Sequence, residues 1–165
     1  MAYQSGDTIL DDHYNTFVQG GASSVNHTVA NVNTIWSTGT QDKGWGQSGA
    51  LSTVSAGTTI TATQWVSLLN RCTTIANHQG QSLVPITNPS TGDTIAAYTS
   101  LSTNLTDITD KRGDCAAVGS SITASGTRTT TATWYNSQSA TFTVTFGSAA
   151  QLRYFFNAGG RIGLN

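Results

Sequence analysis

A short phrase recurs three times in this chain, and each copy is followed by a helix-like apolar pattern. The copies are Gly6-Asp7-Thr8-Ile9, Gly57-Thr58-Thr59-Ile60 and Gly92-Asp93-Thr94-Ile95. Each isoleucine is followed by an aromatic residue, first Tyr14, then Trp65, and in the third copy Tyr98, which lies two residues closer. The copies are too unevenly spaced for a solenoid repeat. We therefore interpret the phrase as a short extended lead-in that positions an amphipathic helix.

The first helical pattern runs from Tyr14 to Trp36, with apolar residues three or four positions apart almost throughout. Asp11 or Asp12 can cap its start, because a short carboxylate accepts hydrogen bonds from the free N–H groups of a first turn. Gly20-Gly21 interrupts the pattern, and two glycines in a helix cost about 1–2 kcal/mol relative to alanine. We expect a break or a kink at that pair.

The second helical pattern is the clearest of the three. Thr61 and Gln64 have the spacing of a capping box, and Gly80 is a natural C-terminal stop. One face is apolar, and its residues are Trp65, Leu68, Leu69, Cys72, Ile75 and Ala76. We expect Cys72 to be a packing residue on that face.

A connector with Pro85 and Pro89 leads to the third pattern, which runs from Ile95 to Ile108. This helix is expected to end near Lys111-Arg112, whose positive charges suit a helix C-terminus, with Gly113 as its stop.

The period changes after residue 120. The segments 127–135 and 140–146 alternate and are rich in threonine, and residues 136–139 join them as in a β-hairpin. Residues 152–156, the turn at 157–160 and residues 161–164 indicate a second hairpin or a strand–turn–strand. The sequence thus predicts an α+β fold, with a helical part over 1–119 and a small antiparallel sheet over 120–165. We expect the two parts to pack as one compact unit.

The composition favours a folded chain that associates with other chains. Only 9% of residues are charged and the net charge is -1, but four Trp, five Tyr and five Phe are available for a core. A surface with so little charge resists association poorly, so copies or partners are expected to cover much of it. The chain also lacks the basic surface that nucleic-acid binding requires, and we expect no nucleic-acid partner.

The cysteines and the apolar pattern indicate a cytoplasmic origin. No signal peptide is recognisable at the start, no apolar run is long enough to span a membrane, and we expect no membrane partner. Cys72 and Cys115 are the only cysteines, and two free thiols are favoured over a disulfide.

No motif for catalysis is recognisable. Asp11-Asp12-His13 is the only cluster of acids with a histidine, but adjacent residues rarely converge on one ion and a capping role explains the aspartates. There is no nucleophile elbow, no phosphate-binding glycine loop with a following lysine, and no Cys-x-x-Cys pair. We expect no catalytic residues, no metal, no cofactor and no enzyme activity.

The Gly- and Ser-rich stretch from 37 to 55 is expected to be a loop. Trp45 lies within it, flanked by glycines. Either this side chain anchors the loop to the core, or it contacts a partner, since tryptophan is over-represented among interface hot spots.

The phrases, the segment Gly44-Trp45-Gly46-Gln47 that follows Trp36, and the closing residues 153–162 (RYFFNAGGRI) together resemble a loose family of virion structural proteins. These are small proteins of tailed bacteriophages, especially phages of cyanobacteria and other aquatic bacteria. The resemblance covers most of the chain, and residues 153–162 are its most specific part. It implies a multi-copy particle component located in the virion, with no catalytic residues to carry over.

The resulting hypothesis is a tail-associated virion protein (neck, tail or fibre attachment) that contacts copies of itself and other virion proteins. A capsid decoration or cement protein is the alternative within this class, and a host-surface glycan-binding module, with Trp45 and Trp134 stacking on sugars, is the alternative from another class. The interface candidates are Trp45, Trp134, Tyr154, Phe155, Phe156 and Arg161.

Overall fold

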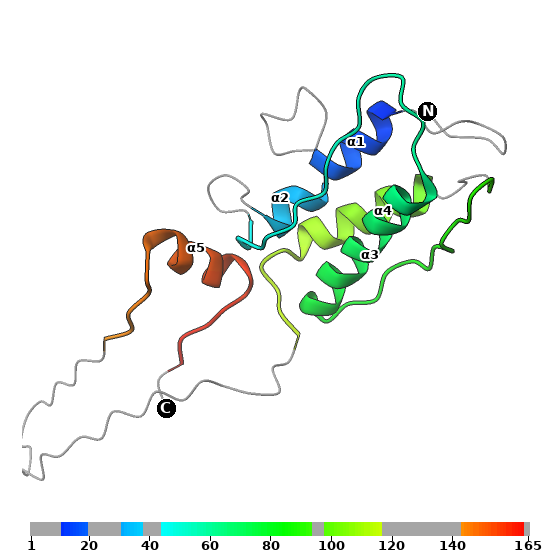
Figure 1. The fold of residues 1–165 in the computed structure, drawn as a ribbon. Coiled ribbons are helices and arrows are strands. Elements are labelled where there is room, and N and C mark those ends of the chain that lie inside the picture. The colour runs from blue at the N-terminus through cyan, green and yellow to red at the C-terminus, as the bar shows by residue number, and fades with distance from the viewer. Residues whose placement is uncertain (1–10, 20–30, 38–43, 94–97, 117–142, 164–165) are drawn as a thin grey trace, which may run out of the picture.

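The computed structural model describes residues 11–19, 31–37, 44–93, 98–116 and 143–163 (Figure 1). Helix makes up 51% of these residues, and they contain no strand. The helices are α1 (Asp11–Gln19), α2 (Val32–Trp36), α3 (Ala62–Gln79), α4 (Tyr98–Asp110) and α5 (Ala149–Asn157). The predicted α+β class is therefore wrong, because the part of the chain that the structure describes has helices and no strand, including over its C-terminal residues 143–163.

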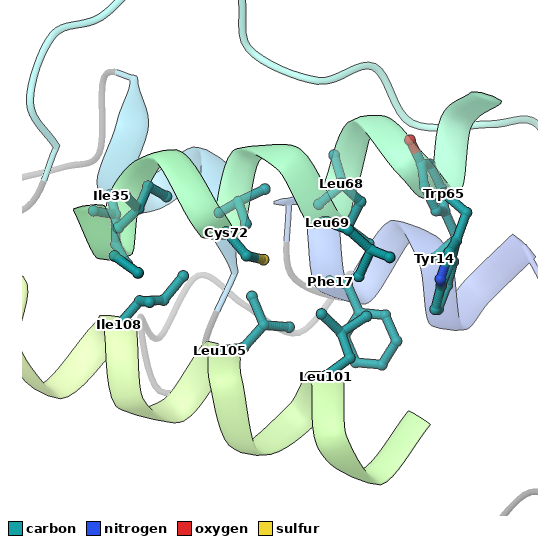
Figure 2. Close-up of a cluster of buried hydrophobic side chains, with 14 of the residues drawn as sticks. Tyr14, Phe17, Ile35, Trp65, Leu68, Leu69, Cys72, Leu101, Leu105 and Ile108 are labelled. Atoms are coloured by element: carbon teal, nitrogen blue, oxygen red, sulfur yellow. The ribbon is translucent and has the colours of Figure 1, made fainter. Parts of the chain in front are cut away.

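The core lies between α3 and α4, and α1 and α2 pack against them. Figure 2 shows Trp65, Leu68 and Cys72 of α3 in the same order along the helix axis as Leu101, Leu105 and Ile108 of α4. Burying a side chain of this size stabilises a fold by about 1.5–3 kcal/mol. The apolar stripe that the sequence predicts for each of these helices is thus the stripe that forms the core.

The two long helices run in the same direction. Gln79, in the last turn of α3, donates a hydrogen bond of 2.8 Å to the carbonyl of Ile108, near the end of α4. The connection must therefore run back along the helices. Residues 81–93 do so without regular structure (Figure 1). We call them the second strap, because residues 49–60 form an earlier irregular segment of the same kind. Asn104 of α4 holds this strap at Val84, with hydrogen bonds to both its N–H (2.8 Å) and its carbonyl (3.0 Å).

The predicted ends of α3 are confirmed. The Thr61 hydroxyl accepts a hydrogen bond from the N–H of Gln64 at 3.2 Å, and the Gln64 carboxamide accepts one from the N–H of Thr61 at 2.8 Å. Gly80 ends the helix with a left-handed backbone, φ 70°, which glycine adopts at little cost. Every residue of the predicted apolar face is buried, and both cysteines are free.

The first helical pattern forms two helices. α1 ends at Gln19 in the described part of the chain, and α2 begins anew at Val32, capped by Asn31 in an extended conformation. The Asn31 carboxamide oxygen accepts a hydrogen bond from the N–H of Thr34 at 2.9 Å. The pattern is therefore broken before Val32, whereas Gly20-Gly21 itself lies outside the described residues.

The recurring phrase begins in a tight turn. The N–H of Thr58 bonds the carbonyl of Ser55 at 3.1 Å, and the N–H of Asp93 bonds that of Ser90 at 3.0 Å. The third residue of each turn is the phrase glycine, with φ 78° at Gly57 and 93° at Gly92. A type II turn needs a positive φ at that position, which explains the glycine. The first copy lies outside the described residues.

The predicted C-terminal sheet is replaced by α5. Ser148 caps this helix by accepting a hydrogen bond from the N–H of Gln151 at 3.1 Å, and Gln151 accepts one from Gly147 at 2.9 Å. Residues 152–156, predicted as a strand, are helical, and residues 143–146 and 161–163 have no strand partner within the described residues. Residues 127–142 of the predicted hairpin lie outside them, as does the boundary at 119 and 120, so the two-part division stays a prediction.

Candidate interaction site

The C-terminal segment is joined to the helical body at Trp45. This side chain is only 5% exposed. Its indole N–H donates to the carbonyl of Asn157 at 3.0 Å and to that of Arg112 at 3.2 Å. One buried donor thus links the loop, the end of α4 and the end of α5.

The segment 44–46 and the closing residues 154–157 contact each other at this point. The Asn157 carboxamide donates a hydrogen bond to the carbonyl of Gly44 at 3.0 Å. The Asn157 carbonyl in turn accepts the hydrogen bond from the Trp45 indole. Gly46 lies so close to the ring of Tyr154 that a Cβ atom there would overlap it. Two hydrogen bonds therefore join these segments, one to the Gly44 carbonyl and one from the Trp45 indole. The missing side chain of Gly46 leaves room for the Tyr154 ring.

The C-terminal end of α3 and the residues after α4 complete the junction. The Nε2 atom of His78 donates to the carbonyl of Ala158 at 2.8 Å, since a carbonyl oxygen can only accept. The His78 ring also lies 4.4 Å from the Trp45 ring, centroid to centroid. The Cys115 thiol bonds the carbonyl of Gly159 at 3.3 Å. Residues from three separate segments, the 44–46 loop, the end of α3 and the stretch after α4, thus hold the end of α5.

The C-terminal segment also carries large apolar side chains that remain at the surface. We call them together the apolar face, and its residues are exposed Val144, Leu152, Phe155, Phe156 and Ile162 with half-buried Phe146. The rings of Phe146, Phe155 and Phe156 lie 5.2–6.5 Å apart and pack on one another. Phe156 is nevertheless 46% exposed and Ile162 50%. Residues 143–163 carry Arg153 and Arg161, both exposed, and no acidic residue, so this segment has a net positive charge.

The interface candidates divide between the junction and its surface. Trp45 is inside the junction, which supports its role as a loop anchor, and Tyr154 is half-buried against Gly46. Phe155, Phe156 and Arg161 are exposed, and Trp134 lies outside the described residues. Sequence reasoning missed Asn157 and His78 as partners of Trp45, because no local pattern links residues so far apart.

Among the described residues, no group of three His, Cys, Asp or Glu side chains could hold a metal ion. His13 packs its ring edge-on against Tyr98 at 5.6 Å. Burial raises the pKa of the Cys72 thiol to about 12, so it stays protonated and a poor nucleophile at neutral pH.

A groove of about 460 Å³ lies between α3 and the second strap. Leu69, Leu83 and Val84 contribute apolar side chains, and several carboxamides, among them Asn70 and Asn77 of α3, line it as well. None of its lining residues is charged. The groove suits a neutral ligand with both polar and apolar groups.

No helix in the described part of the chain combines the length and the apolar character that a membrane span needs. Comparison of the chain with protein-family models, curated proteins and solved structures gives no match.

Proposed function

We propose that this chain is a bacteriophage virion structural protein, associated with the tail, that acts through contacts with copies of itself and with other virion proteins. The observation that carries the proposal is the apolar face. Large side chains such as Phe155 and Phe156 remain exposed on a segment that is firmly anchored to the body. Exposed clusters of this kind mark interaction surfaces, and aromatic residues are enriched there.

The anchoring supports the proposal because a rigid surface loses less entropy on binding than a mobile one. Asn157, Ala158 and Gly159 are each hydrogen-bonded to the helical body. The low charge of the chain, 9% of its residues, agrees with a surface that neighbours cover in an assembly. The resemblance of residues 153–162 to virion proteins points to the same class.

A capsid decoration protein remains the alternative within the class, because the apolar face would serve either location. The glycan-binding alternative needs an exposed aromatic platform. Trp45 and Trp65 are buried, and Trp36 is half-buried with the Arg71 guanidinium 4.2 Å above its ring. Within the described residues, no tryptophan therefore presents a free face for sugar stacking, and this alternative rests on Trp134.

Size-exclusion chromatography with light scattering tests the self-association. The wild-type chain is expected to form a multimer, and Phe155→Ser with Phe156→Ser is expected to shift it toward the monomer. Ala56→Ser is the control, since Ala56 is exposed but lies outside both the apolar face and the groove. A monomeric wild type, or a multimer unaffected by the double substitution, contradicts the proposed role of this face.

Mass spectrometry of purified particles separated into heads and tails tests the location. The chain is expected in the tail fraction at several copies per particle. Its recovery in the head fraction would favour the decoration alternative, and its absence from both fractions would refute a virion role.

A further inference from the structure

In three places, one asparagine side chain forms hydrogen bonds with both the N–H and the carbonyl of a residue outside the helices. Asn104 of α4 bonds both backbone groups of Val84, as described above. Asn15 of α1 does the same to Val54, with bonds of 2.8 and 2.9 Å. Asn33 of α2 does so to Leu51, again at 2.8 and 2.9 Å. A helix-borne carboxamide that both donates to and accepts from one extended residue, here called an asparagine clamp, is thus a recurring device of this fold.

Two of the asparagine clamps hold the same segment, so the distance between its two clamped residues indicates how far apart a pair of clamps should lie. Leu51 and Val54 belong to residues 49–60, here called the first strap, and are three residues apart. An extended chain with three residues per turn presents every third residue on the same side and advances about 9 Å over that distance. A pair of clamps about 9–10 Å apart therefore suits such a segment.

The groove beside the second strap carries a pair of asparagines with this spacing. Asn70 and Asn77 are exposed on α3 and both line the groove. They are seven residues apart, which places them on one helix face about 10 Å apart. Among the described residues, neither carboxamide has a hydrogen-bond partner. Both are therefore available to a ligand.

We infer that this groove binds an extended, uncharged peptide segment of another chain, with Asn70 and Asn77 clamping two of its residues three positions apart. The apolar surface of Leu69 and Leu83 receives a side chain between or beside the clamped residues. The absence of charged residues from the lining selects a neutral segment, because a charged side chain would lose hydration without gaining a partner there. The inference goes beyond the virion role and does not depend on it.

Side-chain NMR of the ¹⁵N-labelled protein tests the inference directly. The probe is a synthetic peptide with the sequence of residues 49–56, blocked at both ends, because this uncharged segment is one that the clamps of this fold already hold. Its addition is expected to shift the side-chain amide signals of Asn70 and Asn77. An absence of shifts at millimolar peptide, or shifts confined to Asn15 and Asn33, overturns the inference.

Substitutions in the groove distinguish hydrogen bonding by Asn70 and Asn77 from nonspecific binding of the peptide. Asn70→Ala with Asn77→Ala is expected to weaken peptide binding by about tenfold or more, since up to four hydrogen bonds are lost. Thr74→Ala is the control on α3, exposed but outside the groove lining, and is expected to bind normally. A peptide with aspartate in place of Leu51 and Val54 is expected not to bind. Equal binding by the double variant, or tight binding of the aspartate peptide, overturns the inference.

Discussion

The indole N–H of Trp45 and the carbonyl of Asn157 are 3.0 Å apart in space and 112 residues apart in the chain. The bond is reinforced from the other side, because the Asn157 carboxamide donates to Gly44, the residue before Trp45. The loop and the end of the last helix therefore each donate one side-chain hydrogen bond to a backbone carbonyl of the other. This pairing holds the exposed apolar face in place on the helical body.

Trp45→Phe is expected to loosen this pairing. It keeps most of the buried ring but removes the N–H that two carbonyls share, and the free energy of unfolding is expected to fall by about 1–3 kcal/mol. Urea unfolding measures this loss. Trp36→Phe is the matched control, since its indole N–H donates to Ser48 in an exposed setting at 2.8 Å, where water can replace it. Equal losses in the two variants would contradict a special role for Trp45.

Gly46→Ala is expected to displace α5 from the body. The backbone of Gly46 has φ 67°, and a Cβ atom there would overlap the Tyr154 ring. Gly57→Ala separates the two effects, because Gly57 has φ 78° with no atom within 4 Å of an added Cβ. Gly57→Ala is expected to cost only the backbone strain, about 1 kcal/mol. Gly46→Ala is expected to cost more and to expose the 149–157 segment to limited proteolysis, whereas an undigested variant would show that the ring can move aside.

Asn104→Ala is expected to release the second strap. Asn104 is 2% exposed, and its loss leaves the N–H and the carbonyl of Val84 without their partners. The expected cost is about 2–3 kcal/mol, and the Val84 amide is expected to lose protection from hydrogen exchange. The corresponding change at half-buried Asn33 is expected to cost less, since water reaches Leu51 more easily. Unchanged exchange at Val84 would contradict the clamp.

The stability of the protein is expected to decline in alkali because of Cys72. Burial raises the pKa of this thiol to about 12, against roughly 8.5 in an unfolded chain. The unfolded chain therefore loses a proton first as pH rises, and unfolding becomes easier between about pH 9 and 12, by up to about 1.4 kcal/mol per pH unit. Tyr14, whose pKa burial also raises, acts in the same direction.

Urea unfolding at a series of pH values checks this decline. Cys72→Ala is expected to flatten the slope between about pH 9 and 12, whatever it does to stability at neutral pH. Tyr14→Phe is the companion variant that removes the other buried group. An unchanged slope in Cys72→Ala would show that this thiol does not titrate differently in the two states.

The failed prediction of a C-terminal sheet has a specific cause. Residues 152–156 form a short apolar run, which fits a strand or a helix segment equally well. The deciding signal was Ser148 followed by Gln151, the same spacing as Thr61 and Gln64 at the start of α3. A cap of this kind predicts a helix clearly only where a long apolar stripe follows it, and the apolar run after Ser148 is too short to show the helical period.

The sequence by itself determined the features that depend on near neighbours. These are the capping box and glycine stop of α3, the apolar stripes of α3 and α4, and the glycine turns before them. Hydrogen bonds within a few residues and the period of a helix explain all of them. Only the tertiary structure decided that Trp45 meets Asn157, that asparagines clamp the straps, and that Phe155 and Phe156 stay outside. Such pairings join residues distant in the chain, and their partners are chosen by the packing of the whole fold.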